Sequence, residues 1–103
     1  MRELPKTLQE LFSDADRWTK RCPARDKNGV QCFYDSEEAE CWCLAGGAQL
    51  IYPNILHTIF KKIRRAADKI GINTEKAFWY SDWNDDKNTS ILDVQALVKE
   101  AGV

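Results

Sequence analysis

The feature that most constrains this chain is a run of apolar residues between positions 54 and 71 that recur at spacings of three and four. The apolar positions of this run are Ile55, Leu56, Ile59, Phe60, Ile63, Ala66, Ala67 and Ile70. Their period places them on one face of an amphipathic helix. We expect Asn54 to cap its start and Gly71 to end it in the left-handed conformation. This is the strongest helix prediction in the chain.

Two segments nearer the N-terminus show the same spacing. In the first, the apolar positions are Leu4, Leu8, Leu11, Phe12, Ala15 and Trp18. They predict a helix from about Pro5 to about Lys20. In the second, Asp35 and Glu38 resemble a capping box. The apolar positions that follow it are Ala39, Trp42, Cys43, Gly46 and Leu50. They predict a second helix that begins near Asp35.

The segment between these two helices contains turn residues. Pro23 blocks continuation of the first helix, and Asn28-Gly29 supplies the positive φ angles of a tight turn. Residues 30–34 are either one strand of a short β-hairpin or an extended loop. Within the second helix, the pair Gly46-Gly47 costs about 1 kcal/mol per residue relative to alanine and indicates that another helix approaches closely there.

The C-terminal segment predicts a last helix. Ser90 and Asp93 form a capping pattern at its start, and Gly102 follows its end. The apolar positions between them are Ile91, Val94, Leu97, Val98 and Ala101. With 44% hydrophobic and 30% charged residues, the composition is typical of a globular chain. We therefore predict a mainly α fold, a compact bundle of about four helices with room for a short β-hairpin between the first two, forming a single domain over residues 1–103.

Charge and hydropathy exclude several classes of function. A net charge of -1 argues against a general polyanion-binding protein, because affinity for phosphates needs many clustered Lys and Arg side chains. The N-terminus lacks the apolar run of a signal peptide, and no stretch approaches the roughly 18 apolar residues of a membrane span. We expect a cytoplasmic protein with no membrane contact. Its cysteines are then expected to be reduced thiols.

The four cysteines are the most evident candidate metal ligands. They are Cys22, Cys32, Cys41 and Cys43. Thiolates bind zinc, as does the imidazole of the only histidine, His57. The spacing is poor, because Cys41 and Cys43 lie two residues apart in an expected helix and point to different faces. Zinc binding is therefore an alternative to buried thiols, which we favour. A lone histidine defines no base for a cysteine nucleophile, so we expect no enzyme, no catalytic residue and no cofactor.

Two surfaces are candidates for binding a partner. The first is an aromatic and acidic segment, and aromatic side chains are enriched at the hot spots of protein interfaces. Its candidate residues are Trp79, Tyr80, Asp82, Trp83, Asp85 and Asp86. The second is the polar face of the helix at 54–71, which offers an alternative role in nucleic-acid binding. Its candidate residues are Lys61, Lys62, Arg64, Arg65 and Lys69.

Three pieces of the chain resemble a family of small bacterial and phage proteins of unknown function, the DUF6197 type. They are residues 18–29, then Ala39 with residues 43–46, and finally Trp83-Asn84-Asp85 with Thr89 and the last helix. Only Cys43 of the four cysteines fits the pattern, which makes a cysteine-based zinc site less favoured. The resemblance implies a compact helical fold and a bacterial or phage setting, with no established activity.

The hypothesis that follows is a non-enzymatic protein-interaction module of a bacterium or phage. An inhibitor of a host defence system, similar to an anti-CRISPR protein, is its concrete version. We expect the turn ahead of Asn28-Gly29 and the pair Asn84-Asp85 to have structural roles first. The identity of the partner and the oligomeric state stay open.

Overall fold

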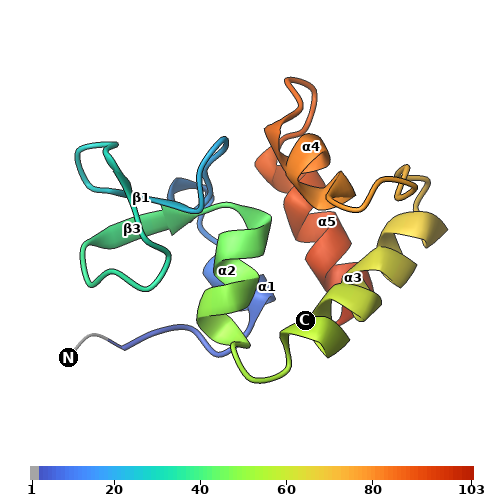
Figure 1. Cartoon of the computed structure of the whole chain (residues 1–103), viewed down its shortest axis with the longest axis horizontal. Coiled ribbons are helices and arrows are strands. Elements are labelled where there is room, and N and C mark those ends of the chain that lie inside the picture. Colours follow the sequence, from blue (N-terminus) through green and yellow to red (C-terminus); the bar gives the residue numbers. More distant parts are fainter. Residues whose placement is uncertain (1–2) are drawn as a thin grey trace.

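The computed structural model describes residues 3–103 as a small three-stranded sheet joined to a group of helices. The elements are α1 (Leu8–Leu11), the 3-10 helix η1 (Ala15–Arg17), β1 (Ala24–Asp26), β2 (Gln31–Cys32), β3 (Ala39–Trp42), α2 (Leu44–Ile51), α3 (Leu56–Lys69), α4 (Trp79–Asp85) and α5 (Ile91–Ala101). The sheet lies at one end of the long axis and α3, α4 and α5 lie at the other, with α2 between them (Figure 1).

The prediction of a helical bundle is wrong, because the described chain combines five α-helices with an antiparallel sheet of strand order β2-β1-β3. β1 and β2 form a hairpin around Gly29, whose φ is +79°. The carboxylate of Asp26 accepts hydrogen bonds from the backbone N–H groups of Asn28 and Val30 and so stabilises the turn. Of the two alternatives for residues 30–34, the structure has the hairpin strand.

The third strand replaces the start of the expected second helix. In its pairing with β1, Ala24 lies opposite Trp42 and Asp26 lies opposite Ala39, with a β-bulge that inserts one residue between these pairs. A bulge shifts the alternation of side chains by one position. Ala39 and Trp42 are therefore both buried although they are three residues apart. This spacing imitates a helical one, which is why the sequence pattern predicted the wrong element.

The second helix begins at Leu44 instead of near Asp35. Cys43 is its N-cap, and the thiol Sγ accepts a hydrogen bond from the backbone N–H of Gly46 at 3.2 Å. The predicted close approach of another helix is confirmed for Gly47, which faces α1, whereas Gly46 faces the chain at Pro23, outside any helix. A Cβ atom on Gly46 would lie 2.2 Å from the carbonyl oxygen of Pro23, and one on Gly47 would lie 2.9 Å from the ring of Phe12.

The long first helix is also not formed. α1 has four residues, and the chain then passes through η1 into an extended segment. The hydroxyl of Thr7 and the carboxylate of Asp14 accept hydrogen bonds from backbone N–H groups at these two short helices. Each cap starts a new helical turn, so the apolar spacing is spread over two separate helices. Trp18 follows them in extended conformation and forms a bridge with Trp42.

The helices α3 and α5 agree with their predictions and form the centre of the core. Gly71 and Gly102 end them with φ values of +89° and +71°, and Ser90 and Asp93 form the expected capping box of α5. The prediction that Asn54 caps α3 is wrong, because Ile55 is the N-cap residue and makes no side-chain hydrogen bond there. The buried faces of the two helices contribute Ile59, Ile63, Ala66, Ala67, Val94, Leu97 and Val98. Within residues 3–103, no helix has the length and apolar character that a membrane span requires.

Candidate functional site

The helix α4 is the centre of the candidate site, because its side chains line three hollows in the surface. The segment before it is held in place by local hydrogen bonds. The hydroxyl of Thr74 donates to the carboxylate of Asp68 on α3, and the side-chain oxygen of Asn73 accepts from the backbone N–H of Glu75 at 3.0 Å. Trp79 and Asn84 are buried, so tertiary packing holds a short helix that has few strong helix-forming residues.

The first hollow, which we call the acidic groove, lies along one face of α4. Its lining consists of residues 71–73, Glu75, Lys76, Trp79, Asp82, Trp83 and Asp86, and its volume is about 470 Å³. The α4 residues Trp79, Asp82 and Trp83 follow the spacing of one helix face, and Asp86 is the C-cap residue that comes next. Trp83 is half-buried between the exposed Asp82 and Asp86. The Asp82 carboxylate has no hydrogen bond or ion pair with any residue in the described part of the chain.

The second hollow, the basic hollow, lies between α3 and the segment that leads into α4. It is lined by His57, Phe60, Lys61, Arg64, residues 74–77, Trp79 and Tyr80, with a volume of about 240 Å³. The rings of Phe60 and Tyr80 pack against each other in it, with centroids 4.7 Å apart and planes tilted by 34°. The cationic side chains are exposed at its rim, and Glu75 is the one carboxylate in the lining. The two hollows share Trp79 and residues 75–76 but have opposite charge.

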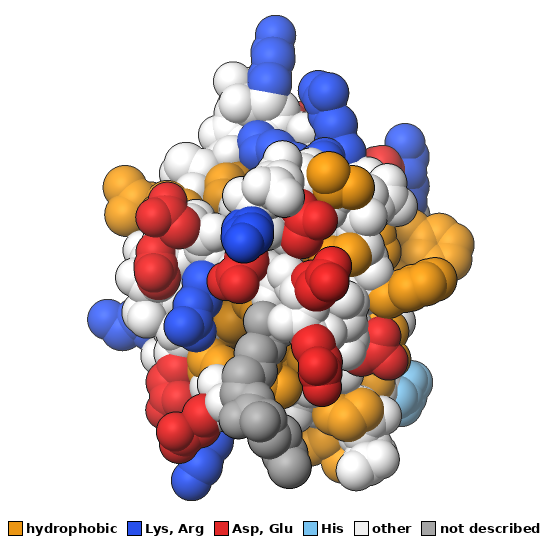
Figure 2. Space-filling view, turned by 90° about the vertical axis from the view of Figure 1, so that its left-hand side faces the viewer, with side chains coloured by type: hydrophobic (Ala, Val, Ile, Leu, Met, Phe, Trp, Pro, Cys, Tyr) orange, Lys and Arg blue, Asp and Glu red, His pale blue; other side chains and the backbone are white. Residues whose placement is uncertain are grey.

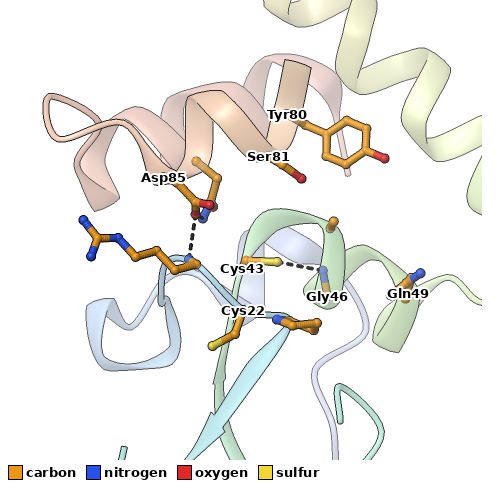
Figure 3. Close-up of a pocket in the computed structure, with 11 residues that line it drawn as sticks. Cys22, Cys43, Gly46, Gln49, Tyr80, Ser81 and Asp85 are labelled. Atoms are coloured by element: carbon orange, nitrogen blue, oxygen red, sulfur yellow. Dashed lines mark hydrogen bonds between the residues drawn. The ribbon is translucent and has the colours of Figure 1, made fainter. Parts of the chain in front are cut away.

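The third hollow lies on the remaining side of α4, against α2 and the chain before β1. Figure 3 shows Tyr80, Ser81 and Asp85 of α4 facing Cys43, Gly46 and Gln49 across a space of about 240 Å³. Here the side chains of Asn84 and Asp85 make hydrogen bonds within the fold. The backbone N–H of Arg21, a residue with φ of +72°, donates to the Asp85 carboxylate at 2.7 Å.

Asn84 is the buried residue that connects the elements around this third hollow. Its side chain is 1% exposed. Its amide oxygen accepts hydrogen bonds from the indole N–H of Trp18 at 2.8 Å and from the backbone N–H of Leu44 at 3.1 Å. Its amide nitrogen donates to the carbonyl oxygen of Thr19 and to the carboxylate of Asp85. One side chain therefore ties α4 to the start of α2 and to the extended segment before the sheet.

The four cysteines do not gather into one cluster of candidate metal ligands. No group of three or more His, Cys, Asp and Glu side chains within residues 3–103 is arranged to hold a metal ion, and all four cysteines are free thiols. Burial raises the pKa of the Cys43 thiol above its usual value, although hydrogen bonds from the backbone of Gly46 and Ala45 lower it in part. Burial also raises the pKa values of the Cys32 and Cys41 thiols.

The structure divides each predicted binding surface into two. Of the aromatic and acidic residues, Trp79, Asp82, Trp83 and Asp86 line the acidic groove, whereas Tyr80 and Asp85 line the third hollow. Of the basic residues, Lys61 and Arg64 line the basic hollow and Lys62 and Arg65 do not. The remaining residue, Lys69, forms an ion pair with Glu100 at 2.9 Å.

Sequence reasoning assigned six residues of the basic hollow to no binding surface: His57, Phe60 and residues 74–77. A signal for the first was available, because His57, Lys61 and Arg64 follow the spacing of one helix face. The contribution of Lys76 could be seen only when the loop was placed against α3. The sheet end carries side chains of both charges, as Figure 2 shows, and a hollow there is lined by Asp26, Lys27, Asn28, Glu38 and Glu40.

Comparison of the chain with models of protein families, with curated proteins and with solved structures found no match. The resemblance to the DUF6197-like family therefore stays a prediction.

Proposed function

We propose that this protein is a non-enzymatic interaction module that binds a protein partner through the acidic groove. The observation that carries the proposal is the placement of the half-buried Trp83 between two exposed carboxylates, those of Asp82 and Asp86, in a groove of about 470 Å³. An aromatic face attracts a cationic side chain, and neighbouring carboxylates complete its hydrogen bonds. The partner is therefore a protein that presents a Lys or Arg side chain.

Among the carboxylates of the groove, we expect Asp82 to make the main contact with the partner's cation. Asp86 already uses its carboxylate to accept a hydrogen bond from the backbone N–H of Asn88 at 2.8 Å, and its carbonyl oxygen accepts one from the Lys20 ammonium. Trp79 is buried in the core, so it shapes the floor of the groove. Asp82 is exposed and has neither restriction.

A protein of this kind acts by occupying a surface of its partner. We place it in the cytoplasm of a bacterium or a phage-infected cell, and an inhibitor of a host defence system is the concrete version of the proposal. Nucleases present basic surfaces to nucleic acid, and an acidic groove is complementary to such a surface.

The test is affinity capture from a lysate of the cells in which the protein occurs, after nuclease digestion, with mass spectrometry of what is retained. We expect wild type to retain one protein in stoichiometric amount and Asp82→Lys to lose it. The matched control is Glu37→Lys, which makes the same charge reversal at an exposed position in the loop between β2 and β3. Retention of no protein by wild type, or equal retention by Asp82→Lys, would contradict the proposal.

A further inference from the structure

We propose that the basic hollow binds single-stranded nucleic acid, with a phosphate held by its cations and a base stacked on its aromatic rings. This inference goes beyond the protein-binding proposal, because it concerns a second hollow of opposite charge, which shares only Glu75, Lys76 and Trp79 with the acidic groove. It rests on the arrangement of charge, on an exposed aromatic ring and on the size of the space.

The basic hollow gathers more positive than negative charge, with the cations of Lys61, Arg64 and Lys76 against the single carboxylate of Glu75. Lys61 and Arg64 project from one face of α3, and Lys76 reaches the same hollow from the segment before α4. None of the three forms an ion pair with another residue among 3–103, whereas Lys69, on the same helix, is paired with Glu100. Cations that are held together without partners attract phosphate groups and release bound counterions when a phosphate arrives.

Phe60 and Tyr80 line the hollow together with these cations, and Phe78 contacts Tyr80 from outside that lining. The Phe78 ring is 69% exposed and meets Tyr80 edge-on, with ring centroids 6.2 Å apart. Tyr80 in turn packs against the tilted ring of Phe60 inside the hollow. An exposed phenylalanine next to a supported aromatic pair offers an apolar face to a nucleobase. Stacking of this kind is largely independent of base identity, because every base has a π-face.

A single strand fits the basic hollow better than a duplex does. The bases of a duplex are stacked on each other, so they cannot reach an aromatic ring on a protein surface without being unpaired. Duplex binding without base contacts needs many phosphate contacts. This chain has a net charge of -1 and gathers only a few cations at a hollow of about 240 Å³. These features fit a splayed nucleotide with its phosphate.

The experiment is fluorescence anisotropy of a labelled short oligothymidylate titrated with the full chain over a series of salt concentrations. The central comparison is Lys61→Ala/Arg64→Ala against Lys62→Ala/Arg65→Ala. Both variants remove two exposed positive charges from α3, but only the first pair lines the basic hollow. We expect the first variant to weaken binding about tenfold more than the second. Its slope of log K against log salt should fall by about 0.7 for each cation removed.

A second comparison isolates stacking from charge. Phe78→Ala should weaken binding about fivefold or more, because loss of one stacked base costs about 1–3 kcal/mol. Phe33→Ala is the control, since Phe33 is 81% exposed, follows β2 and lies at the sheet end of the molecule. It should bind as wild type does. Circular dichroism of each variant checks that the fold is retained, and Lys76→Ala in the loop replaces any α3 variant that unfolds.

Three outcomes would overturn the inference. The first is no binding of the oligothymidylate by wild type at low ionic strength. The second is an equal loss in the two double variants, which would mean that only the overall charge of α3 matters. The third is equal affinity for a duplex of the same length, or no effect of Phe78→Ala, either of which would remove the role of the aromatic rings.

Discussion

The two sides of α4 differ in what their polar side chains do, although the residues are neighbours in the sequence. On the side that faces α2, Asn84 and Asp85 make hydrogen bonds to the segment at residues 18–21 and to the start of α2. On the side of the acidic groove, Asp82 has no partner among residues 3–103. The difference shows that one short acidic motif can hold the fold together on one side and leave charge available on the other.

The largest effect is expected from Asn84→Ala. This change removes the shared acceptor of the Trp18 indole and the Leu44 backbone N–H, and it also leaves the Thr19 carbonyl oxygen without its donor. A buried group that loses its hydrogen-bond partner costs about 1–3 kcal/mol. We expect the free energy of unfolding to fall by about 3–5 kcal/mol, measured by chemical denaturation followed by circular dichroism.

The paired control on the other side of the helix is Asp82→Ala. Because Asp82 is exposed and has no described partner, its removal should change stability by less than about 0.5 kcal/mol. If the two variants lost similar stability, the contrast between the two sides of α4 would be wrong.

The next effect concerns the contact between α2 and the chain that leads into the sheet. Gly46→Ala places a Cβ atom 2.2 Å from the backbone oxygen of Pro23, which cannot rotate away. We expect a loss of about 2–3 kcal/mol, seen as a lower denaturation midpoint. Gly47→Ala meets side chains of Phe12, Leu11 and Leu8, which can shift, so its cost should be smaller. The reverse order would mean that α2 moves more easily than the core beneath it.

A smaller effect is expected at the cap of α2. Cys43→Ala removes the Sγ that accepts the hydrogen bond from Gly46 and should cost about 1 kcal/mol. Cys43→Ser supplies a hydroxyl oxygen in the same place, so we expect it to retain or slightly raise the wild-type stability. Thermal melts of the two variants in parallel check this difference, and equal melting temperatures would show that the cap contributes nothing.

The smallest effect is a dependence of stability on alkaline pH. Burial raises the pKa of Cys43 in the folded state above that of the unfolded chain. The folded protein therefore binds this proton more tightly, and the resulting stabilisation is complete below the unfolded pKa and is lost as pH rises through the folded pKa. We expect stability to decline above about pH 9 and to decline less in Cys43→Ser. Denaturation midpoints over a pH series measure both.

The sequence by itself determined the two long helices and the places where the chain turns. The pattern around Ile59 and Ile63 predicted α3, the Ser90 and Asp93 capping box predicted α5, and Gly71 ends a helix as expected. These features are readable because helical hydrogen bonds and caps connect residues within one or two turns. The spacing of apolar and capping residues along the sequence is therefore enough to predict these two helices.

Only the tertiary structure decided the sheet and the candidate site. β3 is paired through a bulge that places Ala39 and Trp42 on the same side, and Asn84 lies far in sequence from Trp18 and Leu44, with which it bonds. The two hollows likewise exist only once the loop at residues 71–77 lies against its neighbouring helices, which brings it next to Asp82 and Asp86 in one hollow and next to Lys61 and Arg64 in the other. Such contacts join residues that are distant in the chain, and no local period records them. Their energy comes from burial and from pairing of polar groups, which exist only after the elements have packed.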